Sequence, residues 1–137
     1  MYAADHGQVR IKNENFFIVD SKDETIKLLK APPSGDSRTV CFHVKDDKKE
    51  EFVRIFNERY GKYAKLMSID ELDKNHVFGP ETMCERARRR FGDFCAFFEK
   101  GYAFSFVGED FDRSKLNKGC HSGNSDEEMK IPVIVIN

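Results

Sequence analysis

The sequence lacks several features that mark common classes of protein. It contains no tryptophan, and no apolar run approaches the roughly 20 residues that a membrane-spanning helix needs. Residues 1–10 also lack the apolar stretch of a secretory signal. The net charge is only -1, from 23 basic and 24 acidic residues, so there is no excess charge to attract nucleic acid or a membrane surface. We therefore expect neither nucleic acid nor a membrane as a partner.

Paired cysteine motifs are missing as well. The four cysteines show no C-x-x-C spacing: Cys41, Cys84, Cys95 and Cys120. A disulfide framework is therefore not expected, and scattered reduced thiols in a cytoplasmic protein fit the pattern better. The 137 residues are enough for one compact domain, in which the 13 phenylalanines are the main large core residues.

The clearest break in the chain is the stretch APPSGDS, residues 31–37, which is rich in proline, glycine and serine. We place a boundary there and divide the chain into residues 1–35, 36–107 and 108–137. The last part ends in IPVIVI, residues 131–136, a continuous apolar run typical of a strand buried on both faces. The first part is too short to supply the neighbouring strands, so both ends are expected to belong to something larger.

The middle part shows an α+β pattern. Residues 39–44 alternate between apolar and other side chains, as in a half-buried strand. Apolar residues then fall on one face of a helix from Phe52 to Tyr60. Ser68, with Glu71 three residues on, is a capping signal for a short helix. The stretch DFCAFFEKGYAFSF predicts two strands joined as a hairpin at Lys100-Gly101.

Two short motifs contain residues that could bind a metal ion. ADHGQV, near the start, places Asp5 beside His6, and a carboxylate with a neutral imidazole suits Zn²⁺ or a similar ion. Gly7 follows and allows a sharp backbone turn. GCHSGNSDEEM, near the end, places His121 in a glycine-bounded loop before a turn that Ser125 could cap. Either motif alone is more typical of a structural turn.

Taken together and in this order, the motifs resemble the C-terminal half of the alkaline phosphatase superfamily. The likeness is greatest to its bacterial type I phosphodiesterase and nucleotide pyrophosphatase members. In these, the Asp and His of an ADHG motif bind one metal ion. A later histidine, in an HG motif that is followed by S-x-x-E-M-x-V-P, binds the other. The corresponding residues here are Asp5, His6, Gly7, His121, Ser125, Glu128, Met129, Ile131 and Pro132, with Phe78-Gly79 and residues 90–93 also similar. The resemblance implies an α+β subdomain, 36–107, inserted in a fragment of an α/β/α three-layer sandwich, with 1–35 and 108–137 as parts of the metal-binding core.

The resemblance also implies a function. Asp5 and His6 would bind one ion and His121 a second, both Zn²⁺ by the family pattern, in a hydrolase that acts on a phosphate ester or nucleotide. Residues 36–107 would cover the substrate. The family's upstream half, which carries a first Asp ligand, a Thr or Ser nucleophile and an Asp-x-x-x-His pair, has no counterpart here. We therefore expect a C-terminal fragment with no catalytic residue of its own, inactive alone and weak in binding metal. Ser122 also stands where the family has glycine.

Two alternatives stay open. In one, the chain is a stand-alone, non-catalytic module whose residues 36–107 bind a partner. In the other, it is a small protein with a structural metal ion held by Cys120, His121 and further cysteine or histidine residues. Neither the substrate, the identity of the metal nor the oligomeric state follows from the sequence.

Overall fold

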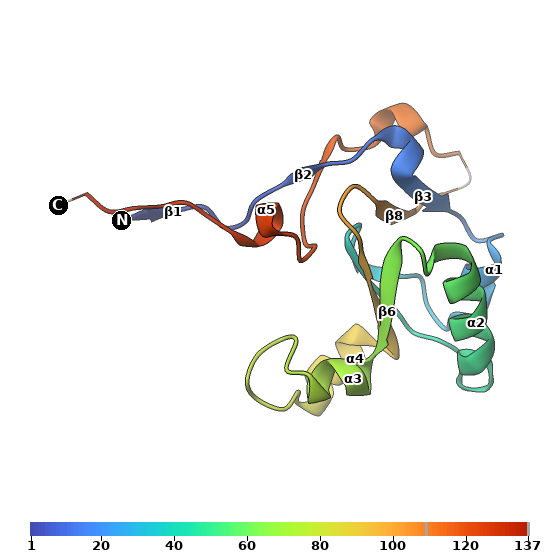
Figure 1. Cartoon of the computed structure of the whole chain (residues 1–137). Helices are drawn as coiled ribbons and strands as arrows, with labels where there is room; N and C mark the ends of the chain where they lie inside the picture. The colour runs from blue at the N-terminus through green and yellow to red at the C-terminus, as the bar shows by residue number, and fades with distance from the viewer. Residues whose placement is uncertain (109, 137) are drawn as a thin grey trace.

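The computed structural model describes residues 1–108 and 110–136 (Figure 1). Its strands are β1 (Tyr2–Ala3), β2 (Val9–Arg10), β3 (Phe16–Val19), β4 (Ser34–Asp36), β5 (Thr39–Phe42), β6 (Ala64–Ser68), β7 (Phe94–Phe98), β8 (Ala103–Phe106), β9 (Gly119–Cys120) and β10 (Val133–Ile134). Its α-helices are α1 (Glu24–Lys27), α2 (Lys49–Tyr60), α3 (Ile69–Lys74), α4 (Glu85–Phe91) and α5 (Asp126–Met129), and short 3₁₀ turns cover Asn13–Asn15, Asp46–Lys48 and Arg113–Lys115.

A four-stranded antiparallel sheet, in the order β4-β5-β7-β6, forms the centre of the body. Helix α2 packs on one face, where the Phe42 ring lies 5.2 Å from that of Phe52 and 5.6 Å from that of Phe56. On the other face, Cys41 packs with Leu72 of α3. Because neighbouring residues of a strand point to opposite faces, β5 contributes to both layers of the core.

The local sequence patterns of the middle part are largely confirmed. Residues Thr39–Phe42 form β5, and the amphipathic pattern forms α2, which buries Phe52, Phe56 and Tyr60. Ser68 caps α3 together with Glu71. The stretch expected to be a break contains β4, which pairs with β5, so it belongs to a hairpin.

The hairpin predicted at Lys100-Gly101 is wrong. Strand β7 pairs with β5 and β6, whereas β8 runs parallel to β3. The chain does reverse direction between β7 and β8. However, the N–H of Phe98 donates to the carbonyl of Arg38 at 2.9 Å, and that of Phe104 donates to the carbonyl of Ser37 at 2.8 Å. The segment Ser37-Arg38 thus takes the hydrogen bonds that a hairpin would have formed.

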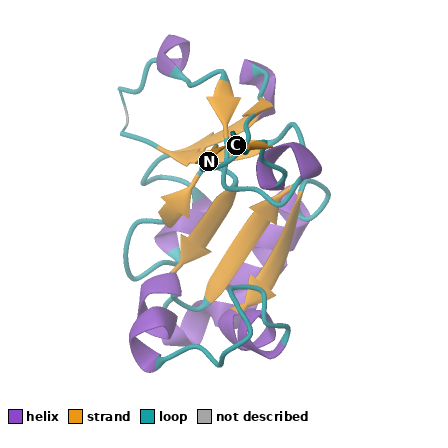
Figure 2. Cartoon of the chain, turned by 90° about the vertical axis from the view of Figure 1, so that its left-hand side faces the viewer, coloured by secondary structure: helices purple, strands orange, loops and turns teal. Residues whose placement is uncertain are grey.

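The two ends of the chain run side by side, away from the body (Figures 1 and 2). Strand β2 pairs with β9, and further out β1 pairs with β10. Burial of residues 131–136 on both faces is not observed, because Val133 and Ile134 are 55% and 57% exposed. Among the described residues, β1 is the one neighbour of β10, and a two-stranded ribbon cannot cover either of its faces.

We predict that amide hydrogens in residues 40–60 exchange with solvent more slowly than those in residues 1–30. The first segment forms β5 and α2 around the main core, whereas the second includes β1, which has one partner strand. Hydrogen exchange followed by mass spectrometry would measure the difference. Slower exchange in residues 1–30 would contradict our expectation that residues 38–107 form the most ordered part.

Candidate metal-binding loops

The structure brings His6 and His121 together from opposite ends of the chain. His6 lies in the loop before β2, and His121 directly follows β9. Since β2 and β9 are antiparallel, with Val9 opposite Cys120, these two loops meet at the same end of the strand pair. The two imidazole rings stack with their centroids 3.9 Å apart and their planes 21° from parallel.

Asp5 lies beside His6 and is open to solvent. Its Oδ2 is 3.5 Å from Nε2 of His6, and its side chain is 88% exposed. Hydrogen bonds from the backbone N–H groups of Asp5 and His6 lower the pKa of the Asp5 carboxyl below its usual value. Asp5 is therefore ionised at neutral pH, the form in which a carboxylate binds a cation.

A second carboxylate, that of Asp36, lies at the other ring. Its Oδ2 is 3.6 Å from Nδ1 of His121. The loop that carries His121 is also fixed by Thr39, whose hydroxyl donates to the carbonyl of Ser122 at 2.5 Å. Sequence reasoning missed Asp36, because an aspartate next to glycine in a stretch rich in turn residues gives no signal of a distant partner.

Both loops approach helix α5 so closely that glycine is required. The N–H of Gly7 donates to the carbonyl of Glu128 at 2.9 Å, and a Cβ on Gly7 would lie 1.7 Å from the carbonyl oxygen of Glu127. A Cβ on Gly123 would lie 2.5 Å from a carboxylate oxygen of Glu128. Ser122 has a φ of 73°, in the left-handed region that favours glycine, which is the residue that the resemblance expects there.

A buried ion pair supports this arrangement. The side chains of Arg38 and Glu128 are 0% and 1% exposed. Nε and Nη2 of Arg38 donate to the two carboxylate oxygens of Glu128 at 2.9 and 2.8 Å. Nη1 donates to the carbonyls of Glu99 and Tyr102 at 2.6 and 2.7 Å. These contacts use four of the five N–H groups of the guanidinium, so the buried charge is both paired and hydrogen-bonded.

Glu128 also holds the loop that contains His121. It accepts hydrogen bonds from the N–H of Gly123 at 2.9 Å and from the hydroxyl of Ser125 at 2.6 Å. Burial raises the pKa of Glu128, but the hydrogen bonds from Arg38, Ser125 and Gly123 outweigh that effect and hold the pKa at about 2. The sequence predicted Ser125 and Glu128 as a cap, which is confirmed, but gave no sign of Arg38.

These residues do not by themselves make a complete metal site. Within residues 1–108 and 110–136, no three histidine, cysteine, aspartate or glutamate side chains are grouped so that they could hold an ion. A stable Zn²⁺ site normally has three or four protein ligands. Cys120, which the structural-metal alternative requires, is buried in an apolar cluster with Val9 and Ile11. Within the described residues, Asp5, His6 and His121 therefore do not reach the number of grouped ligands that a stable Zn²⁺ site needs.

Comparison with known proteins gives a likeness of fold. No family model and no curated protein matches the chain. Among solved structures, human ectonucleotide pyrophosphatase/phosphodiesterase 5 is similar, with a TM-score of 0.64 and 13% sequence identity over 94% of this chain. The mouse protein of the same name is similar with a TM-score of 0.59 and 15% identity, both on its own and as an inactive variant in complex with AMP. This chain spans 31% of the length of each. Its mixed α/β fold therefore matches part of a nucleotide pyrophosphatase/phosphodiesterase.

We predict that Glu128→Gln lowers the free energy of unfolding by about 3 kcal/mol at neutral pH, because it leaves the buried Arg38 without its counter-charge. Urea denaturation followed by circular dichroism would measure the loss. Glu127→Gln is the matched control, since the exposed Glu127 pairs with Lys100 at the surface and the loss of this pair should cost at most about 1 kcal/mol. Equal effects of the two substitutions would contradict the role of the buried pair.

The same variant should change how stability depends on pH. The pKa of Glu128 is about 2 in the folded chain, against an ordinary value of 4.5. The ionised form therefore stabilises the fold above about pH 4.5, and this contribution, about 3 kcal/mol, is lost as the pH falls toward 2. Glu128→Gln should show a smaller loss over that range than the unchanged chain. Equal losses would show that other carboxylates account for the acid sensitivity.

Proposed function

We propose that this chain is the C-terminal part of a metal-dependent phosphoesterase of the phosphodiesterase or nucleotide pyrophosphatase kind. The observation that carries the proposal is that His6 and His121, from opposite ends of the chain, stack against each other. They do so in a fold that is similar to 31% of human ectonucleotide pyrophosphatase/phosphodiesterase 5. Two divalent ions, Zn²⁺ by the family pattern, would stabilise charge on the transferring phosphoryl group and activate the nucleophile.

The chain's own residues would then have distinct roles. Asp5 and His6 would supply a carboxylate and an imidazole to one ion, and His121 an imidazole to the other. Asp36 would orient His121, because a carboxylate near Nδ1 favours a proton on that nitrogen and leaves Nε2 free to bind metal. Arg38 and Glu128 would position both loops, since they contact no proposed ligand side chain but hold the glycines beside them.

We propose that the rest of such an enzyme joins at the exposed ribbon. Apolar residues on it are open to solvent: Tyr2 67%, Val133 55%, Ile134 57%, Val135 67% and Ile136 68%. Contiguous apolar surface of this kind marks an interface, and a two-stranded ribbon can be extended by further strands. We infer that residues 1–35 and 108–137 complete a three-layer α/β/α core, with residues 36–107 as the covering subdomain.

The proposed substrate is a phosphate ester or nucleotide, and the complex of the mouse protein with AMP supports this class. No helix within the described residues has both the length and the hydrophobicity to span a membrane. We also propose a reducing, cytoplasmic environment, because all four cysteines are free in the structure.

The decisive experiment compares the chain alone with the chain produced together with a complementing N-terminal part. We expect Zn²⁺-dependent hydrolysis of bis(4-nitrophenyl) phosphate only by the combined protein. His121→Ala should abolish it, whereas His76→Asn, at an exposed histidine with a φ of 53°, is the matched control and should not. Absence of turnover by the combined protein would contradict the proposal. Turnover by the pure chain alone, lost in His121→Ala, would contradict the expectation that the chain is inactive without a complementing part.

Binding of Zn²⁺ provides a second measurement on the chain alone. We predict weak binding in isothermal titration calorimetry, because the side chains present form only part of each ligand set. His6→Ala should then change the titration little. Submicromolar binding that is lost in His6→Ala would instead show that the chain builds a complete site, and would favour the structural-metal alternative.

A further inference from the structure

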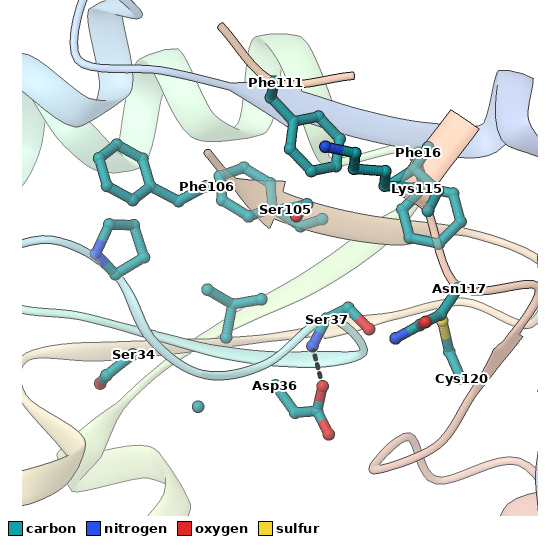
Figure 3. A pocket seen from close by; sticks show the side chains of 15 residues that line it. Phe16, Ser34, Asp36, Ser37, Ser105, Phe106, Phe111, Lys115, Asn117 and Cys120 are labelled. Atoms are coloured by element: carbon teal, nitrogen blue, oxygen red, sulfur yellow. Dashed lines mark hydrogen bonds between the residues drawn. The ribbon is translucent and has the colours of Figure 1, made fainter. Parts of the chain in front are cut away.

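A cavity of about 380 Å³ lies beside the candidate metal-binding loops. Figure 3 shows Ser34, Asp36 and Ser37 on one side of it, and Phe106, Phe111 and Lys115 on the other. Its volume is in the roughly 300–1,000 Å³ range of small-molecule sites. The walls come from β3, β4, β8, β9 and the segment after β8, so they are built from residues far apart in the sequence.

Three of the four phenylalanines that line the cavity have no aromatic partner among the described residues, the exception being Phe104. In the core, Phe42, Phe98 and Phe104 belong to a continuous set of ring contacts. Within the part of the chain that the structure describes, the rings of Phe16, Phe106 and Phe111 contact no other aromatic ring. Phe106 is also 36% exposed. Phe16 is buried against Val9 and Ile11, so the rings of Phe106 and Phe111 are the ones available to a planar apolar group.

The polar lining has unused donors. Among residues 1–108 and 110–136, the side chains of Ser34, Ser105, Lys115 and Asn117 make no hydrogen bond or ion pair. Asp36 is already engaged, because it accepts the N–H of Ser37 at 2.7 Å and faces His121. Among the described residues, the charged group at the cavity that has no partner is thus the ammonium group of Lys115, with the amide of Asn117 nearby in the sequence.

We propose that this cavity binds a small planar aromatic molecule that carries an anionic group. Its ring would contact Phe106 and Phe111, and its anion would accept hydrogen bonds from Lys115 and Asn117. A plain anion would leave the rings unused, and a plain hydrocarbon would leave the lysine unpaired. The proposal goes beyond the phosphoesterase assignment, because no proposed metal ligand lines the cavity. Asp36 connects the two sites, since it lines the cavity and contacts His121.

The test uses the whole chain with a metal chelator present and phenyl phosphate as the probe. Titration followed by ¹H–¹⁵N NMR should give saturable shifts at Phe106, Lys115 and Asn117. Lys115→Met should weaken binding about fivefold, as expected for one partly exposed charged hydrogen bond. Phe106→Leu should weaken it by a similar factor, about fivefold, through lost stacking. Lys118→Met is the matched control, because Lys118 is exposed in the same segment and does not line the cavity.

Phenol and inorganic phosphate separate the two halves of the proposed ligand. Each should bind at least about tenfold more weakly than phenyl phosphate, because each offers only one kind of contact. If inorganic phosphate bound as tightly as phenyl phosphate, the cavity would be an anion site only and the proposal would be overturned. Equal losses of affinity in Lys115→Met and Lys118→Met would also overturn it, as would the absence of saturable shifts. Since no metal is present, failure here leaves the hydrolysis experiment unaffected.

Discussion

The buried pair of Arg38 and Glu128 is the interaction on which the rest of the structure depends. A charge without water or a partner is costly in a protein interior, so this arginine and this glutamate are stable there only together. Arg38 directly precedes β5 and also binds the turn between β7 and β8. Glu128 belongs to α5, near the end of the chain. The pair therefore ties the C-terminal segment to the body of the molecule.

The positions of the two histidine loops follow from this pair. The side-chain carboxylate of Glu128 accepts a hydrogen bond from the N–H of Gly123, two residues after His121. The backbone carbonyl of Glu128 accepts one from the N–H of Gly7, one residue after His6. A single residue thus fixes both loops, one through its side chain and one through its backbone. The pairing of β2 with β9 adds a second connection on the other side of the histidines. The stacked rings are held between these two supports.

Features governed by local sequence could be predicted, and features governed by distant partners could not. The helix α2 and the caps at Ser68 and Ser125 follow from residues within a few positions of one another. The hairpin at Lys100-Gly101 was wrong because Ser37 and Arg38 supply the competing carbonyls from far upstream. Asp36 and Arg38 gave no signal for the same reason. For His6 and His121, the resemblance predicted two metal-binding loops, whereas the sequence pattern alone would have left two separate turns.

The ribbon at the ends of the chain shows how burial depends on neighbours as well as on composition. Residues 131–136 are apolar and β-branched, yet the two residues that form β10 are exposed on a strand with one partner. Apolar strands in the body, such as β5 and β7, are buried because helices cover both faces of that sheet. The candidate loops lie where these two regions meet. Glu128 therefore connects these loops to the body. The exposed apolar surface that could accept further strands lies on the ribbon, away from the body. A larger sheet could thus join the ribbon without displacing the contacts that position His6 and His121.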